Sequence, residues 1–589
     1  MRSIFALEFR NFVAKKRFFA LRAALAAGAL GIFWLAAIDR TYRLDRLGRD
    51  LFTASAFGLV VLAALFAPAV LAPVFVEEKK LGKLDVLRSA PISAGGIVFG
   101  KWLARSAILA LVVLAIFPFT AVSVLFGGVM PWHLPIPLVI ALATLAWTSA
   151  AGLFAGARAK EVGGAILVAY TLVAVVLGSA FGGVVLAQEV VGRANAPWFF
   201  KGAMHYAVAT NPFAALDAAA GASGSNSPFF RPYANDAWWY LVFAAALTTL
   251  FLGATVLSIS RDARQGRRRW RRAAAIDCRK DEAEANAPTS AAEPLRLPPV
   301  ARGRDLRRRP ELWLELSRGR KAAWSIVRAA QLVVLLILES IWLIALISEK
   351  SRRGWRSPVR LQEYAAIHFG AVATALGLAL IVAVVGGSVA VHRDGELRTR
   401  EVLFTTPLAS RRLAFAKLVG AIRPAVPLLA IGAAHALFAA VLGDLTAPRA
   451  LATCLIGLVI VLGSAVFCMR LTLRAKGATA AIVLGLGAFA AVFLALPLAT
   501  LIIVDNETIR FGETRLPTLF FHPTWWIALA VLPEIEPYWS EHLENTPAWI
   551  ALCLWTVAAL RVGLFGLPVL YERLREDELA GGSERPPSP

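Results

Sequence analysis

Charged residues are scarce in this chain. Asp, Glu, Lys and Arg account for 17% of its 589 residues, apolar residues account for 58%, and the mean hydropathy is +0.64. Typical soluble proteins carry about 25% charged residues, because polar side chains must cover their surface. This composition excludes an ordinary soluble protein and predicts that much of the surface faces lipid.

Cysteine and histidine are also rare. The chain has seven histidines and four cysteines, which are Cys278, Cys454, Cys468 and Cys553. The cysteines form no CxxC pair and have no histidine at ligand spacing, so neither a disulfide framework nor a metal site is predicted. The motifs HExxH and GxSxG are absent, and we expect no catalytic residues. A membrane-embedded, lipid-modifying enzyme remains the alternative to a transport protein.

A complete phosphate-binding loop is missing as well. Gly95, Gly100 and Lys101 have the spacing of such a loop, but Trp102 stands where Ser or Thr must bind Mg²⁺. No stretch is long and polar enough to form an ATPase domain. We therefore expect this chain to bind no cofactor itself, so that ATP and Mg²⁺ would belong to a separate subunit.

Long apolar windows are abundant. Residues 51–76, 134–157, 162–187 and 478–504 carry almost no charge, and each can cross a hydrocarbon layer of ~30 Å as a helix. About twelve such spans fit along the sequence. The windows lack the strict alternation of lipid-facing strands, so an all-α, polytopic membrane protein is predicted.

The charges are strongly unbalanced, with a formal net charge of +23. They concentrate in loops between apolar windows and in residues 261–320, where five of residues 267–272 are arginine. This pattern marks cytoplasmic loops that meet anionic lipid, and it gives no reason to expect nucleic acid as a partner. We interpret residues 261–320 as a cytoplasmic linker. An even number of spans on each side then places both termini in the cytoplasm of a bacterial cell, with the chain in the inner (plasma) membrane.

An internal repeat divides the chain into residues 1–260 and residues 321–589. Pro91 matches Pro407 (407 − 91 = 316), and Lys101 matches Lys417 (417 − 101 = 316). The same offset pairs Leu81 with Leu397, Asp85 with Glu401, Val86 with Val402, Leu87 with Leu403, and Phe99 with Phe415. We therefore predict two parallel, pseudo-symmetric halves of six spans each, with Pro91 superposing on Pro407.

A charged segment lies between the second and third spans of each half, at residues 77–91 in the first half and 393–407 in the second. In the first half, Leu81, Leu84 and Leu87 form one stripe of a short amphipathic helix, Pro91 ends it, and Ser93 is placed to cap the third span. A plain cytoplasmic loop is the simpler interpretation. The repetition with fixed spacing favours a surface that binds a partner.

Residues 404–411, which include Thr405, Thr406 and Pro407, resemble the turn that type 2 ABC exporter permeases carry in this segment. The Asn211-Pro212-Phe213 element is similar to one that the same family carries before its last span. The resemblance implies a membrane-spanning permease that exports a substrate, not identified by the sequence, with two permease repeats fused in one chain. It also implies that the charged segment is a coupling helix, which docks on a separate ATPase subunit.

The resemblance places ATPase coupling on eleven residues: Glu77, Glu78, Leu84, Asp85, Leu87, Pro91, Asp394, Leu397, Glu401, Leu403 and Pro407. We expect the leucines to contact the ATPase and not the membrane fold. Replacing Leu84 and Leu87 by Asp is thus expected to leave the fold intact and to abolish recruitment of the ATPase.

Three polar residues, Glu339, His435 and Arg561, lie inside apolar windows. A charge at mid-membrane costs about 2.5 to 3.5 kcal/mol if unpaired, so each side chain should face the interior of the bundle. We expect a buried ion pair between Glu339 in the seventh span and Arg561 in the twelfth. Pro424 and Pro427 are expected to break the ninth span, whereas the third span contains only Pro118.

Overall fold

The computed structural model describes most of the apolar chain. Apart from a few isolated positions, it covers residues 44–84, 92–126, 129–159, 161–186, 197–220, 237–284, 322–353, 361–390, 408–473, 478–490, 510–511, 514–515 and 546–583. These residues are helical except for turns and one two-residue antiparallel pair, β1 (Arg510–Phe511) with β2 (Thr514–Arg515). The predicted all-helical class is confirmed.

Eight helices in the described ranges are long and apolar enough to cross a membrane, or up to nine if one bent pair is a single span. This is the composition of a multi-pass membrane protein. The predicted number was about twelve. A further apolar run of the sequence, residues 18–38, lies outside the described residues, and only part of the window 478–504 lies within them.

Among the described residues, nine helices of eight or more residues lie before the linker or at the start of the second half. They are α3 (Leu44–Leu71), α4 (Pro73–Lys80), α6 (Ala94–Val122), α7 (Pro135–Arg158), α8 (Val162–Leu186), α9 (Pro197–Thr210), α10 (Pro212–Ala220), α11 (Ala237–Glu284) and α14 (Ala322–Arg353). The second half continues with α15 (Leu361–Val389), α18 (Ser410–Ile422), α19 (Val426–Val441), α20 (Ala447–Thr472), α21 (Ala478–Ala490), α25 (Thr546–Arg561), the π-helix η9 (Val562–Gly566) and α26 (Leu567–Ser583). Two short 3-10 turns, η1 (Ser123–Phe126) and η2 (Pro131–His133), join α6 to α7.

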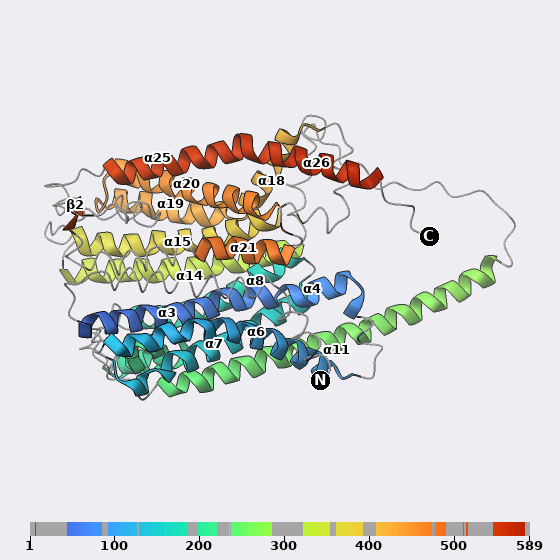
Figure 1. The fold of residues 1–589 in the computed structure, drawn as a ribbon, viewed down its shortest axis with the longest axis horizontal. Coiled ribbons are helices and arrows are strands. Elements are labelled where there is room, and N and C mark those ends of the chain that lie inside the picture. Colours follow the sequence, from blue (N-terminus) through green and yellow to red (C-terminus); the bar gives the residue numbers. More distant parts are fainter. Residues whose placement is uncertain are drawn as a thin grey trace.

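The same helix neighbours recur in both parts of the bundle. Helix α7 packs against α3 and α11, and α3 packs against α6; correspondingly, α20 packs against α15 and α25, and α15 packs against α19. In Figure 1 the blue to green helices form one side of the bundle and the yellow to red helices form the other. One buried apolar cluster lies within the first set, and a second joins helices of both sets.

Small residues allow the central helices of each set to approach closely. A Cβ atom added to Gly156 on α7 would lie 2.1 Å from the carbonyl oxygen of Ala72, and one added to Gly387 on α15 would lie 2.6 Å from that of Ala465. In lipid no hydrophobic effect drives helices together, so their association depends on close van der Waals packing of this kind. Each crossing therefore depends on a glycine.

The ninth predicted span is broken as expected. Helix α18 ends at Ile422 and α19 begins at Val426, with a bend of 61° between them. Pro424 and Pro427 lack the N–H groups that would continue the helical ladder. Helix α6 contains Pro118 and still runs unbroken from Ala94 to Val122.

Helix α11 continues beyond its apolar part. It runs for 48 residues to Glu284, so the first part of the predicted linker is helical. Arg and Ala, which are frequent between residues 261 and 284, favour helix. This part of α11 projects away from the bundle in Figure 1. Residues 285–320 lie outside the described ranges.

Candidate functional site

The charged segment of the first half is held against the bundle by a buried ion pair. Glu78 on α4 pairs with Lys101 on α6, and Lys101 is only 2% exposed. Lys79 donates a hydrogen bond to the carbonyl oxygen of Ala157 at the end of α7. Two consecutive side chains thus fix α4 to α6 and to α7.

The ion pair also explains why residues 95–102 are no phosphate-binding loop. Lys101 is buried and turned toward Glu78. Trp102 donates a 2.9 Å hydrogen bond to the Ser149 hydroxyl, which also accepts one from Ser106 at 3.0 Å. These residues therefore connect α6 to its neighbours.

A sharp turn follows α4 and carries the exposed part of the segment. Gly82 has a φ of +67°, a left-handed conformation that favours glycine. Leu81 is 65% exposed, and Lys83 is also exposed. The predicted cap is confirmed, because the Ser93 hydroxyl accepts a 3.1 Å hydrogen bond from the Gly96 N–H at the start of α6.

The expected role of Leu84 needs correction. Leu84 is only 1% exposed and belongs to the apolar core formed by α3, α6 and α7, while Leu87 packs partly buried against the same core. An amphipathic stripe indicates which side of a helix is apolar, but not whether that side meets the fold or a partner. Leu81, on the exposed turn, is the leucine of this segment that remains accessible.

The structure describes only one further predicted coupling residue besides Glu78, Leu84 and Leu87. Glu77 lies half-buried in α4 beside Glu78. The remaining ones lie outside the described residues: Asp85, Pro91, Asp394, Leu397, Glu401, Leu403 and Pro407.

The residues that directly follow the second charged segment meet the C-terminal helix. Ser410, the first residue of α18, donates a hydrogen bond to the Glu572 carboxylate on α26. Arg575 on α26 donates a 3.3 Å hydrogen bond to the carbonyl oxygen of Leu408. Helix α26 therefore holds the N-terminal end of α18 in place.

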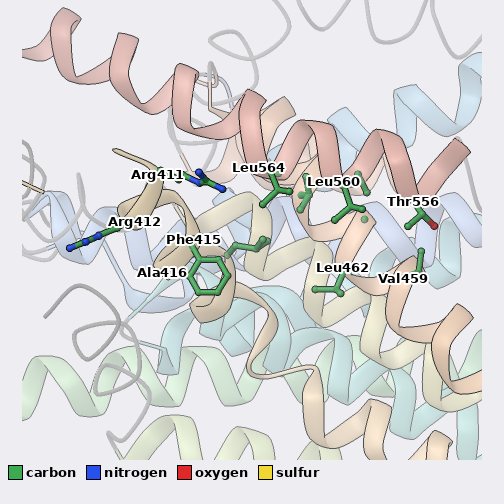
Figure 2. Close-up of a pocket in the computed structure, with 14 residues that line it drawn as sticks. Arg411, Arg412, Phe415, Ala416, Val459, Leu462, Thr556, Leu560 and Leu564 are labelled. Atoms are coloured by element: carbon green, nitrogen blue, oxygen red, sulfur yellow. The ribbon is translucent and has the colours of Figure 1, made fainter. Parts of the chain in front are cut away.

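A groove of about 610 Å³ opens beside α18. Its labelled residues in Figure 2 are Arg411, Arg412, Phe415 and Ala416 on α18, Val459 and Leu462 on α20, and Thr556, Leu560 and Leu564 on α25 and η9. Two guanidinium groups at one end of an apolar trough are chemically suited to an amphiphile with an anionic head, such as a membrane phospholipid.

A smaller cavity of about 230 Å³ lies between the two sets of helices. Its walls come from α3, α8 and α10 on one side and from α14, α15 and α19 on the other, and include Leu65, Tyr170, Phe213, Gln331, Leu378 and Leu428. Tyr170 donates a hydrogen bond to the carbonyl oxygen of Leu65, and Phe213 stacks on Phe57 with ring centroids 5.9 Å apart.

The Asn211-Pro212-Phe213 element forms the corner between α9 and α10. The Asn211 side-chain oxygen accepts a 2.9 Å hydrogen bond from the Phe213 N–H, which caps α10. Its amide donates a 3.3 Å hydrogen bond to the carbonyl oxygen of Leu177 on α8. Asn211 thereby places Phe213 in the wall of the cavity.

The expected pair between Glu339 and Arg561 is wrong. Glu339 Oε2 lies 2.9 Å from His435 Nδ1, whereas Arg561 is exposed at the junction of α25 and η9. His435 in turn contacts His368, which contacts Asp444. No motif in the sequence singles out His368 or Asp444, and their only signal is that each is a polar residue at the edge of an apolar window.

Among the residues that the structure describes, no group of three or more His, Cys, Asp or Glu side chains could hold a metal ion. Comparison of the sequence with protein-family models gave no match, and comparison with curated proteins gave none either.

Proposed function

We propose that this chain is the membrane-spanning permease subunit of an ABC transporter, which exports a substrate with energy from a separate ATPase subunit. In this proposal the chain has twelve spans, six in each of two parallel halves, and residues 261–320 link the halves in the cytoplasm. Both termini lie in the cytoplasm and the chain resides in a bacterial inner membrane.

The observation that carries the proposal is a reciprocal contact between the halves. Helix α8 of the first half packs against α15 of the second, and α21 of the second half packs against α3 of the first. The repeat offset matches α3 with α15 and α8 with α21. Exchanging the halves therefore exchanges the two contacts, which is the property of an interface with two-fold symmetry.

A two-fold interface between membrane-spanning halves suits a transport pathway. Transporters built from repeats place their substrate site where the repeats meet, and rocking of one half against the other opens it to alternate sides. The cavity of about 230 Å³ lies at this interface. Its mostly apolar walls, with Tyr170, Thr171 and Gln331 as polar groups, support a substrate with a large apolar part.

The charged segments support the coupling role. They repeat at a fixed offset, and the first presents the exposed turn from Lys80 to Lys83 on a helix held by the Glu78–Lys101 pair. A segment tied to two spans through charged side chains can transmit a push from a docked partner to those spans. The arginine-rich continuation of α11 supports placing this end of the bundle in the cytoplasm.

Co-expression with candidate ABC-type ATPase subunits from the same genome tests the proposal. We expect the two proteins to purify together and ATP hydrolysis to depend on the complex in lipid nanodiscs. The double variant Leu81→Asp, Lys83→Glu should lose the ATPase while remaining folded, because both side chains are exposed. Leu125→Asp is the control, since Leu125 is exposed at the other end of α6. Equal recovery of the ATPase with both variants would refute coupling at this turn, and lack of any complex would refute the transporter assignment.

A further inference from the structure

The groove beside α18 is charged at one end and apolar along its length. Arg411 and Arg412, whose side chains are exposed, lie in the first turn of α18. From Arg411 the groove runs past Leu564 and Leu560 toward Thr556 (Figure 2). Among the described residues that line the groove, Thr556 is the one polar residue besides the two arginines. A molecule that fits the groove is therefore anionic at one end and apolar over the rest.

The first half shows that the repeated fold does not require these arginines. The repeat offset matches Arg411 with Gly95 (411 − 316 = 95) and Arg412 with Gly96 (412 − 316 = 96), between the matched prolines and the matched lysines. Cations in the first turn of a helix are also unfavourable, because the helix dipole places partial positive charge there. The two arginines thus destabilise the start of α18 unless an anion binds beside them.

The described part of the chain does not supply that anion. Among the described residues, no carboxylate forms an ion pair with Arg411 or Arg412. The Glu572 carboxylate on α26, at the same end of α18, accepts a hydrogen bond from the Ser410 hydroxyl instead. A guanidinium group can bind a phosphate through two parallel N–H···O bonds. Two neighbouring arginines are therefore well suited to a phosphate group from outside the chain.

The position of the arginines along the bundle favours a lipid as the source of this phosphate. The arginine-rich continuation of α11 leaves the bundle at the end where α18 begins (Figure 1). Arginine clusters favour the cytoplasmic side of a membrane, where anionic lipids give the surface a negative potential. Lipid phosphates are therefore available beside the first turn of α18.

The apolar walls of the groove are long enough for a large part of an acyl chain. The lining residues run from Val459 to Val466 on α20 and from Thr556 to Leu564 on α25 and η9. At a rise of ~1.5 Å per residue, these stretches extend over roughly 10 to 12 Å. One leaflet contributes about half of the ~30 Å hydrocarbon layer. The groove therefore follows most of one leaflet, with the arginines at its outer end.

We propose that this groove is a binding site for one anionic phospholipid, whose phosphate group binds Arg411 and Arg412 and whose acyl chain lies along α20, α25 and η9. The charged contact distinguishes the site from the rest of the lipid-facing surface, and the apolar contact distinguishes a lipid from a free anion. The bound lipid neutralises the two arginines and fills the space between α18 and the last span. The inference needs only the membrane location of the chain, so it does not depend on the transport role.

Native mass spectrometry of the purified full-length chain in detergent tests the charged contact. Dioleoyl phosphatidylglycerol, which is anionic, should occupy one site more tightly than dioleoyl phosphatidylcholine, which has the same acyl chains and no net charge. The double variant Arg411→Gln, Arg412→Gln should weaken phosphatidylglycerol binding roughly 30-fold, the effect of two basic residues at an anionic surface, and leave phosphatidylcholine binding unchanged. Arg261→Gln, Arg573→Gln is the matched control, because it removes two exposed arginines outside the groove and should retain the tight site.

Ala559→Phe tests the apolar contact, because it fills the groove without changing any charge. It should abolish the tight site, whereas Val557→Phe, at a 61% exposed position outside the groove on the same helix, should retain it. Glycerol phosphate, which lacks acyl chains, should not displace the lipid. The arginine variants alter only exposed positions and decide the question if Ala559→Phe does not fold. The proposal is overturned if both lipids bind equally, if the two arginine pairs have equal effects, if glycerol phosphate competes, or if a folded Ala559→Phe variant keeps the site. A lipid-free dimer that Ala559→Phe dissociates would likewise overturn it, since a second copy would then occupy the groove.

Discussion

Gly156 on α7 lies directly against the backbone of Ala72, between α3 and α4. A Cβ atom at Gly156 would be 2.1 Å from the Ala72 carbonyl oxygen, a distance at which the helices must move apart. We expect Gly156→Ala to destabilise the first half by about 1 to 3 kcal/mol, the usual cost of overpacking. Unfolding in detergent with increasing denaturant would measure this loss.

Gly58 on α3 is the matched control for Gly156, since an added Cβ atom there meets nothing within 4 Å. Gly58→Ala should leave stability unchanged or raise it by about 0.5 to 1 kcal/mol, because alanine favours helix over glycine. Equal losses of stability from both substitutions would mean that the close approach to Ala72 is not the reason why alanine at position 156 destabilises the fold.

Glu78 and Lys101 are expected to depend on each other. Glu78→Gln leaves Lys101 buried without its counter-charge, and Lys101→Gln does the reverse, so each change should cost about 3 to 5 kcal/mol. The double variant removes both charges and should cost less than the sum of the two. A double-mutant cycle on unfolding free energies measures this coupling; additive losses would contradict a direct pair.

Tyr240 connects α11 to α7. Its hydroxyl accepts a 3.1 Å hydrogen bond from Trp147 and lies 2.7 Å from the Thr144 hydroxyl. Hydrogen bonds between membrane helices contribute about 0.6 kcal/mol on average, so we expect Tyr240→Phe to lower stability by about 1 kcal/mol. Tyr206→Phe should cost less in the same unfolding assay, because the Tyr206 hydroxyl is exposed and its 3.2 Å hydrogen bond to the Ser179 hydroxyl competes with solvent.

Leu84 and Leu81 should respond differently to truncation. Leu84→Ala removes core contacts and is expected to cost about 2 to 5 kcal/mol, whereas Leu81→Ala should change stability by less than about 0.5 kcal/mol. Thermal unfolding of the two variants separates a core leucine from a surface leucine. A stable Leu84→Ala variant would return Leu84 to the set of residues available to a partner.

The residue pattern alone was sufficient for features that depend on neighbours in sequence. The apolar windows predicted helices at 51–76, 134–157 and 162–187, and the structure has α3 with α4, α7 and α8 there. Pro424 and Pro427 predicted the break in the ninth span, and Ser93 predicted the cap of α6. Helix length, helix capping and proline breaks arise from hydrogen bonds within one segment, so one segment is enough to predict them.

What only the tertiary structure decided is which side chains meet. His368 is 67 residues from His435 and 76 from Asp444, and Glu78 is 23 residues from Lys101. Contacts at these separations depend on how far each helix is rotated about its axis and shifted along it, and close packing of the whole bundle sets both quantities. For this reason the sequence identified Glu339 as a costly intramembrane charge but assigned it the wrong partner, and it placed Leu84 on an apolar stripe without deciding that the stripe faces the core.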